Sequence, residues 1–341
     1  MTRYFVGGDL GGTKSHLLIA DETGRALGFA AGGIANHEVV GYPAVTDVVR
    51  QMLAGALASA GLRADQISGA GMGIAGFDWP SERTAQLSAL AAAGLQGFPV
   101  EVVNDAVVGL LAGSREGWGI GLVSGTGCNC WGIDPHQRYG RVLGLGSRVG
   151  EFAGGAALVE RAIWAVARAA TQRGPATDLA DAFVTYVGAE SVDDFLEGFC
   201  EFRFEVPPSA APVVFEVASA GDSVAVECIT WAGHELADLA IGVIRQLGFQ
   251  TLEFDLVLIG SLFKGGSLLT EPMDREIRAV APGAHSFLLT APPVVGGVVL
   301  AMAQAGLDVR SKNEWLLAST VGLQLRDDAP AGTVPAYEVH S

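Results

Sequence analysis

The chain has 341 residues, of which 21 are lysine or arginine and 37 are aspartate or glutamate, so its formal net charge at pH 7 is −16. So acidic a surface repels nucleic acids and anionic membranes, which excludes a protein that works by binding either of them. The length exceeds what one hydrophobic core usually serves, and two domains are therefore expected. The 47 glycines, nearly twice the average usage of about 7%, fit a fold with many tight strand turns.

The first predicted elements are two strands joined by a glycine-rich turn. An apolar segment over residues 3–10 carries Asp9 near its end, and a second strand is predicted over residues 16–20. The turn between them contains Gly11, Gly12, Thr13 and Lys14. A glycine turn lets backbone N–H groups approach an anion, and a hydroxyl and an ammonium add donors suited to phosphate oxygens. The pattern fits either a phosphate-binding hairpin with a magnesium-binding acid or an ordinary hairpin with a glycine-rich turn.

The rest of the first domain is predicted to alternate strands and helices. Strands are expected near residues 26–31, 68–75 and 100–103, and helices near 41–60, 81–93 and 104–114. The first three strands are connected as hairpins, whereas helices separate the later ones, which should therefore pair in parallel. The last strand ends on Asn104 and Asp105, where a helical pattern begins. An acid at such a junction is often only a helix cap, so this position alone leaves its role open.

The second half of the chain repeats this organisation around a second glycine turn. Strands near residues 118–124 and 129–133 flank Gly125, Thr126 and Gly127. A mainly helical region follows to about residue 250 and includes a long helix over residues 222–247. The order of hairpin, helix and strand thus occurs twice, as in a duplicated domain. The elements that complete the repeat are a strand over 252–259 that ends in Gly260 and Ser261, a helix near 271–280, a strand near 285–289 and a helix near 295–306.

Four cysteines in a chain that has no apolar N-terminal signal segment predict a reduced, cytoplasmic protein. Cys128 and Cys130 form a C-x-C pair, but no second close pair completes a zinc site, so structural or substrate-lining thiols are favoured over metal ligands. Residues 279–307 lack charged side chains, yet prolines and paired glycines divide them into a strand, a turn and a buried helix. A membrane span is therefore not expected there.

Two glycine hairpins with an acid that opens the helix between them resemble the actin, sugar kinase and Hsp70 superfamily. Within it the sequence is most similar to the N-acetylglucosamine kinase family, which is grouped with the activating ATPases of benzoyl-CoA reductase and of 2-hydroxyacyl-CoA dehydratases. The segments that carry the resemblance appear in family order and cover residues 4 to about 306. They are residues 7–14, 35–37, 71–76, 104–106, 124–130, 150–151 and 293–296.

The resemblance implies an α/β, actin-like ATPase fold of two ribonuclease H-like domains, with a duplicated βββαβαβα order, that flank a nucleotide cleft. The expected boundaries are residues 1–116 for the first domain and 117–306 for the second, with the helix near 295–306 packing back on the first domain. Residues 307–341 are expected to form a C-terminal helix and a flexible tail, because residues 327–341 carry prolines and charges without periodicity.

The resemblance also implies roles for the nucleotide-binding residues. Phosphoryl transfer needs positioned phosphates, a metal ion that neutralises charge, and a group that accepts the proton of the attacking hydroxyl. Both glycine turns are expected to hold ATP, Asp9 is expected to hold Mg2+ through water, and Asp105 is expected to be the general base. Gly260 and Ser261 are expected to lie against the adenosine, by analogy with the same strand end in related folds.

The sugar site implied by the resemblance draws on several segments of the chain. Amides and carboxylates suit a polyol, because each can bond two hydroxyls. Glu151 replaces the aspartate of the family's Gly-Asp motif, which leaves the exact sugar open. The residues expected to bind the sugar are Asn36, His37, Asp105, Cys128, Asn129, Gly144, Leu145, Gly146 and Glu151.

The predicted function is an ATP-dependent kinase that phosphorylates the 6-hydroxyl of N-acetylglucosamine or a related amino sugar such as glucosamine. We expect a cytoplasmic homodimer that binds a small-molecule sugar, with no nucleic acid and no membrane as partner. One alternative is an ATPase activator of a dehydratase or reductase, which would hold an iron–sulfur cluster with cysteines from two subunits. The other is a glucokinase-like hexose kinase, although the zinc-binding cysteine cluster usual in that family is absent.

Overall fold

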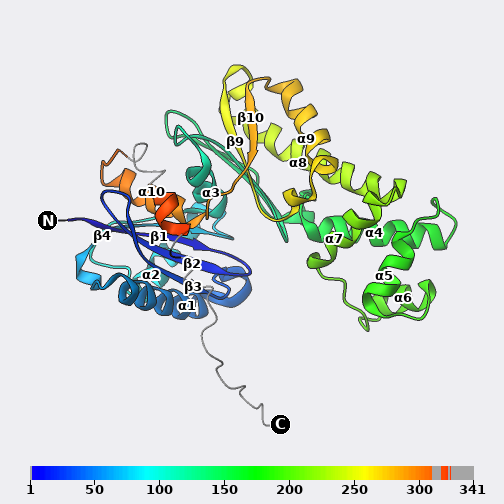
Figure 1. The fold of residues 1–341 in the computed structure, drawn as a ribbon, viewed down its shortest axis with the longest axis horizontal. Coiled ribbons are helices and arrows are strands. Elements are labelled where there is room, and N and C mark those ends of the chain that lie inside the picture. The colour runs from blue at the N-terminus through cyan, green and yellow to red at the C-terminus, as the bar shows by residue number, and fades with distance from the viewer. Residues whose placement is uncertain (1, 309–315, 322, 324–341) are drawn as a thin grey trace, which may run out of the picture. The chain divides into compact units, whose positions relative to one another are not determined.

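The computed structural model describes residues 2–308, 316–321 and 323. The chain divides into two compact units, of which unit 1 comprises Met1–Ala112 with Ala291–Ser341 and unit 2 comprises Gly113–Thr290. Each unit is built on one five-stranded mixed sheet with helices packed against it (Figure 1). Within the described ranges, no helix is long and apolar enough to cross a membrane.

In unit 1 the strand order is β3-β2-β1-β4-β5. The first three strands are antiparallel hairpins, while β4 and β5 run parallel to β1. A non-helical Gly41, with φ of 74°, interrupts α1 near its start, so the long helix predicted from residue 41 is preceded by one extra turn. The elements are β1 Tyr4–Leu10, β2 Ser15–Asp21, β3 Ala26–Gly32, α1 His37–Ala60, β4 Ile67–Ile74, α2 Arg83–Ala92, β5 Val100–Asn104, α3 Asp105–Gly113 and α10 Val294–Gln304.

In unit 2 the strand order is β10-β9-β6-β7-β8, with β6, β7 and β8 antiparallel and β9 and β10 parallel to β6. A helical segment separates β8 from β9. The elements are β6 Gly119–Ser124, β7 Cys128–Ile133, β8 Tyr139–Arg141, α4 Gly155–Ala170, α5 Leu179–Val187, α6 Val192–Cys200, α7 Ala211–Ser219, α8 Ser223–Leu247, β9 Phe254–Ile259, α9 Ser267–Val280 and β10 Ala284–Leu288.

The two sheets have the same order and the same strand directions, so the predicted duplicated α/β fold is confirmed. Two details differ from the sequence-based expectation. The three-residue strand β8 is the third strand of the expected order, but its position was not predicted, because so short a segment carries no readable alternation. Helix α9 begins at Ser267 rather than near residue 271, and its interior Pro272, which disfavours a helix locally, is buried against Gly233 of α8.

Helix α10 packs on the sheet of unit 1 through glycines. Gly7 of β1 and Gly71 of β4 are register partners, and α10 runs over them (Figure 1). A Cβ added at Gly297 would lie 2.6 Å from the Gly8 nitrogen and 2.7 Å from the Gly71 oxygen, so helix and strand backbones touch directly. The expected second-domain range of 117–306 thus includes a helix that the structure places in unit 1, and the glycine contacts are the physical reason.

The C-terminal residues are described only in part. Residues 316–321 are helical, and the hydroxyl of Ser319 accepts a hydrogen bond from the Ala26 nitrogen at the start of β3. Leu316 and Thr320 are buried. The tail predicted over residues 327–341 lies outside the described residues.

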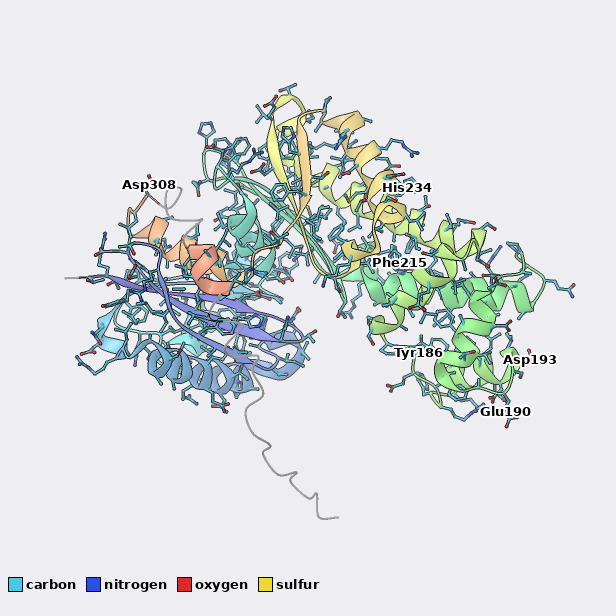
Figure 2. The ribbon with its side chains drawn as sticks, in the orientation of Figure 1. Tyr186, Glu190, Asp193, Phe215, His234 and Asp308 are labelled. Carbon is cyan, nitrogen blue, oxygen red and sulfur yellow. The ribbon has the colours of Figure 1, made fainter. Side chains whose placement is uncertain are left out.

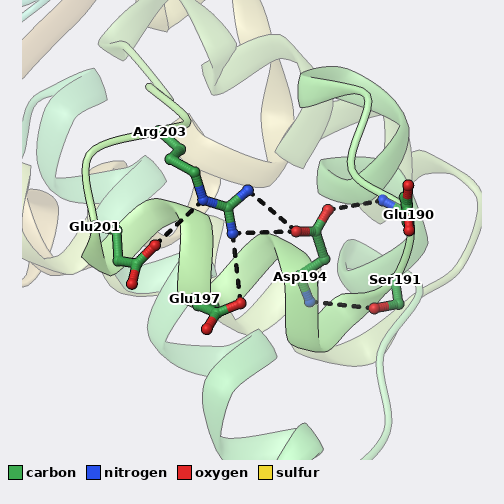
Figure 3. A network of polar contacts seen from close by, with 6 residues as sticks. All are labelled: Glu190, Ser191, Asp194, Glu197, Glu201 and Arg203. Atoms are coloured by element: carbon green, nitrogen blue, oxygen red, sulfur yellow. Dashed lines mark hydrogen bonds and ion pairs between the residues drawn. The ribbon is translucent and has the colours of Figure 1, made fainter.

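Arg203 joins helix α6 to the loop that follows it (Figure 3). The Arg203 guanidinium donates to Asp194 at 3.1 Å, to Glu201 at 3.3 Å and to Glu197 at 3.5 Å. Asp194 also accepts the Glu190 nitrogen, and this bond together with Arg203 lowers the pKa of that carboxyl. The network fixes the loop that follows α6 to the helix itself.

The glycine contact between α10 and the sheet predicts a large effect for a single methyl group. Gly297→Ala should lower the free energy of unfolding of unit 1 by about 1–3 kcal/mol, because the Cβ would press on the Gly8 and Gly71 backbones. Gly242→Ala in α8 is the matched control, since it gains the same helix propensity with no atom within 4 Å of the new Cβ. Urea denaturation measures both variants, and equal stability would contradict the proposed backbone packing.

Candidate active site

Three acids lie at the carboxyl ends of three neighbouring parallel strands in unit 1. Asp9 is near the end of β1, Asp78 follows β4, and Asp105 follows β5 directly. The register pairs Leu10 with Ile74 and Ile74 with Asn104, so these strand ends are level with one another. Ligand sites in α/β sheets form at this edge, which makes the three acids the centre of the candidate site.

Asp105 is held by its neighbour at the start of α3. The Asn104 side chain donates to Asp78 Oδ1 at 3.0 Å and accepts the Ala106 nitrogen at 3.0 Å, and Asp105 Oδ1 accepts the same nitrogen at 2.9 Å. Burial raises the pKa of Asp105 to about 7, and the nearby carboxylates of Asp9 and Asp78 contribute to the rise. A carboxyl group poised near neutral pH is suited to accept a proton from a substrate.

The first glycine turn presents an open face beside Asp9. The Gly11 nitrogen donates to the Ser15 hydroxyl at 3.2 Å, and the Gly11 oxygen accepts the Ala35 nitrogen at 3.0 Å, so the base of the turn is fixed. Gly12, Thr13 and Lys14 are exposed, and a Cβ at Gly12 would meet no atom within 4 Å. The turn therefore offers an amide, a hydroxyl and an ammonium to a ligand.

The acids of this edge suit a magnesium ion that is shared with a ligand. Within the described residues, no group of three or more His, Cys, Asp or Glu is placed to hold a metal ion. Mg2+ in phosphate-transfer sites is usually held by one or two carboxylates together with substrate phosphates and water. Asp9, half-buried beside the open turn, fits that mode of binding.

Asn36 and His37 lie at the start of α1. Asn36 caps the helix, because its Oδ1 accepts the Glu38 nitrogen at 2.8 Å. The His37 ring stacks on Tyr42 with centroids 4.8 Å apart, and its Nδ1 accepts the Gln86 amide at 2.9 Å. The other ring nitrogen lies 3.8 Å from Glu82. The His37 side chain is thus packed against Tyr42 and hydrogen-bonded to Gln86.

Glu82 lies between the His37 ring and the segment that carries Asp78. Its Oε2 accepts the backbone nitrogens of Asp78 and Trp79, each at 3.0 Å, and thereby holds the segment that carries Asp78. Asp78, Glu82 and Gln86 were not predicted as site residues. Asp78 had a readable signal, since it follows a parallel strand whose end meets the same edge as Asp9 and Asp105.

In unit 2 the second glycine turn is fixed by the start of α4. The Gly155 and Ala156 nitrogens donate to the Gly125 and Thr126 oxygens at 2.8 and 3.0 Å. Within the turn, the Gly125 nitrogen donates to the Gly127 oxygen at 2.9 Å. The start of the helix therefore orders the turn through backbone contacts.

The end of β9 reaches the same turn. Gly260 has φ of +116°, a conformation that favours glycine, and a Cβ there would lie 3.3 Å from the Gly125 nitrogen. Ser261 follows and is exposed. Phe215 of α7, labelled in Figure 2, packs against Gly265, which lies a little further along the chain than Gly260. The structure thus brings Gly260 and Ser261 to the turn formed by Gly125, Thr126 and Gly127.

A second cluster in unit 2 surrounds Glu151, which is buried. Its Oε1 accepts the Leu143 nitrogen and its Oε2 accepts the Leu145 nitrogen, both at 2.8 Å. Gly144 has φ of +72°, and a Cβ there would lie 3.1 Å from Asn129 Nδ2. The Glu151 nitrogen in turn donates to the Gly146 oxygen at 3.0 Å. Through these bonds Glu151 holds the loop formed by Gly144, Leu145 and Gly146 in place, and we call this its clamp role.

Cys128 adjoins this cluster at the start of β7. Burial raises the pKa of Cys128 to about 11, and the Glu151 carboxylate acts in the same direction, so the thiol is neutral at pH 7. Burial also raises the pKa of Cys130. A thiol that is neutral at pH 7 is a poor nucleophile.

The structure therefore gathers the sequence-predicted residues into one set in unit 1 and two sets in unit 2. In unit 1 the strand ends bring together Asp9, residues 11–14 and Asp105. Asn36 and His37 lie at the start of α1. In unit 2 the glycine turn meets Gly260 and Ser261, and Asn129 meets the loop clamped by Glu151. The binding roles of these residues remain predictions.

Two α/β units with the same strand order, each with a glycine turn between its first two strands, make up an actin-like ATPase fold. Residues 6–301 match the BadF/BadG/BcrA/BcrD ATPase family, and the chain belongs to that family.

Curated relatives are similar over most of the chain. An N-acetyl-D-glucosamine kinase of Dictyostelium discoideum is 23% identical over 310 residues, which cover 87% of this chain and 97% of the relative. An N-acetylmuramic acid/N-acetylglucosamine kinase of Clostridium acetobutylicum is 24% identical over 306 residues, which cover 89% and 99%.

Solved structures share the fold. A candidate N-acetylglucosamine kinase of Chromobacterium violaceum has a TM-score of 0.68 and 23% identity, with 87% of this chain and 98% of that chain covered. A ROK family glucokinase of Streptomyces griseus, solved with glucose and AMPPNP, has a TM-score of 0.53 and 22% identity, with 88% and 99% covered.

The raised pKa of Asp105 predicts a pH-dependent gain in stability when its charge is removed. Folding holds the pKa at about 7 against an ordinary value of 3.8, so ionisation costs stability as the pH rises from 4 to 7. Asp105→Asn should therefore stabilise unit 1 at pH 8 by about 1–3 kcal/mol and change little at pH 4. Urea unfolding at both pH values measures this, with exposed Asp47→Asn as control. A stability difference that does not change with pH would contradict the raised pKa of Asp105.

The clamp role of Glu151 predicts a local effect of shortening its side chain. Glu151→Asp should leave one of the Leu143 and Leu145 nitrogens without its acceptor, because the shorter carboxylate cannot reach both. Amide exchange over residues 143–150 should then become faster, by about fivefold for a net loss of about 1 kcal/mol. Hydrogen exchange followed by mass spectrometry measures this, and unchanged protection of the loop would rule out the clamp.

Proposed function

We propose that the protein is an ATP-dependent kinase that phosphorylates the 6-hydroxyl of N-acetylglucosamine or a related amino sugar. The observation that carries the proposal is Asp105, a carboxyl with a pKa of about 7 at the strand-end edge, beside Asp9 and an open glycine turn. Family membership supports the use of ATP, and the printed activities of the two curated relatives support the amino sugar.

In the proposed reaction Asp105 accepts the proton of the sugar 6-hydroxyl as its oxygen attacks the γ-phosphorus of ATP. The new oxygen–phosphorus bond forms as the bond to the bridging β–γ oxygen breaks, and ADP leaves with that electron pair. The proposed phosphate donors are the amides of each glycine turn, together with Thr13 and Lys14 in unit 1 and Thr126 in unit 2. Mg2+ bound by Asp9, through water, would neutralise charge on the phosphates.

The sugar is proposed to bind through groups that can each hold two hydroxyls. Asn36 has its amide nitrogen available beyond the helix cap, since the cap uses only its oxygen. Asn129, Gly144, Leu145, Gly146 and Glu151 form the proposed binding loop of unit 2, where each carboxylate oxygen of Glu151 keeps a lone pair beyond the backbone bond that it accepts. His37 and Cys128 are proposed as lining residues, and Gly260 with Ser261 as the adenosine contact. We further propose a cytoplasmic homodimer.

The test is ADP release with ATP and Mg2+ against a panel of sugars, namely N-acetylglucosamine, glucosamine, glucose, N-acetylmannosamine and N-acetylmuramic acid, with a control that lacks sugar. We expect sugar-dependent turnover, and Asp105→Asn should lower kcat by about 100-fold or more because the attacking hydroxyl loses its base. Asp47→Asn, which removes an exposed acid of α1, should be unaffected.

Two outcomes would count against the proposal. ADP release that needs no sugar would favour an activator ATPase, and full activity of Asp105→Asn would remove the proposed base. An unchanged KM for sugar in that variant, with a reduced kcat, is the result that the mechanism requires.

A further inference from the structure

His16 of β2 lies directly across from Asp9 of β1, because the two residues are register partners in the antiparallel hairpin. The side chains of such a pair project from the same face of the sheet. His16 Nδ1 is 3.9 Å from Asp9 Oδ2, and the two side chains are only 15% and 19% exposed. The His16 ring also stacks on Phe29 of β3, with ring centroids 5.5 Å apart. His16 is thus a packed side chain whose Nδ1 lies beside the acid proposed to hold Mg2+.

His16 and Asp9 both present polar atoms that the rest of the described chain does not bond. The Nδ1 atom of His16 is buried and forms no hydrogen bond within the described residues. Asp78 and Asp105, the other two strand-end acids, accept hydrogen bonds at 3.0 and 2.9 Å, whereas no residue that the structure describes donates one to the Asp9 carboxylate. A buried polar group without a partner costs free energy, and native proteins seldom keep one without a function for it.

The separation of the two groups limits how they can interact. The 3.9 Å between His16 Nδ1 and Asp9 Oδ2 exceeds an N–H···O hydrogen bond, which spans about 2.7–3.2 Å. It is also less than the roughly 4.5 Å spanned by a water that bonds two groups at about 2.8 Å each. A side-chain rotation that closes the gap by about 1 Å therefore makes the bond direct. A carboxylate beside Nδ1 favours the tautomer that carries the proton there, so His16 is the donor.

We propose that His16 is a positioning residue, which donates from Nδ1 to Asp9 Oδ2 and fixes the orientation of that carboxylate for Mg2+ binding. Hydrogen bonds to metal-binding side chains set their orientation and thereby contribute to metal affinity. One carboxylate oxygen of Asp9 then accepts the His16 proton, and the other stays available to a metal-bound water. This inference rests on the proposed kinase function and adds His16 to the residues that act on the metal ion.

The experiment measures how much Mg2+ strengthens the binding of AMPPNP, a non-hydrolysable ATP analogue, by calorimetric titration with Mg2+ and with EDTA. The ratio of the two affinities reports metal binding without turnover. His16→Phe keeps a ring on Phe29 and removes the donor. We expect it to lower the ratio about fivefold or more, while AMPPNP binding in EDTA stays as in the parent protein.

Two amide variants test which ring nitrogen matters. His16→Asn places a donor near the position of Nδ1 and should retain most of the ratio, whereas the longer side chain of His16→Gln reaches toward the position of Nε2 and should lose it. This pair decides the inference by itself if His16→Phe does not fold. His285→Phe is the matched control, since it makes the same substitution at an exposed residue of β10 and should leave the ratio unchanged.

Several results would overturn the inference while the kinase function stands. They are a parent protein whose AMPPNP binding does not depend on Mg2+, a ratio that His16→Phe does not change, equal weakening of that variant with Mg2+ and with EDTA, and an equal loss in His16→Asn and His16→Gln. Sugar-dependent ADP release tests the kinase function separately. Absence of AMPPNP binding by the parent protein under both conditions would overturn both.

Discussion

The glycine contacts between α10 and the sheet of unit 1 are the constraint on which the site depends. Gly7, Gly71 and Gly297 let the helix rest on the strand backbones, and a Cβ added at Gly296 would meet the backbone of α3. Since α3 begins at Asp105, this close packing fixes the position of the carboxyl relative to β1 and β4. Larger side chains would separate these layers, because a packed interior does not absorb extra atoms without strain.

The same geometry makes the site unstable in one respect. Parallel strands that end level with one another place Asp9, Asp78 and Asp105 at one edge, where burial and then like charges raise the pKa of Asp105. The fold offsets this cost through backbone and amide bonds, such as those that Asn104 makes to Asp78 and to the Ala106 nitrogen. A carboxyl that is held near neutral pH is thus both a cost in stability and the group best suited to accept a proton.

Much of the fold was readable from the sequence because its signals are local. The glycine turns, the buried strands and the acid at the start of α3 each depend on a few adjacent residues, and the duplicated order followed from them. Gln86 could not be read in this way, since its partner His37 lies on another segment. Glu82 was missed although its partners, the Asp78 and Trp79 nitrogens, lie just four and three residues before it. Glu151 was predicted as a sugar ligand, but its bonds to Leu143 and Leu145 depend on how the loop folds back.

The most direct measurement of the central claim is 31P NMR of the products formed from ATP and Mg2+ with N-acetylglucosamine and with glucosamine. The account predicts a phosphomonoester whose coupling to the C6 protons identifies a sugar 6-phosphate, in an amount equal to the ADP formed. Inorganic phosphate as the only phosphorus product besides ADP, formed at the same rate with and without sugar, would contradict it.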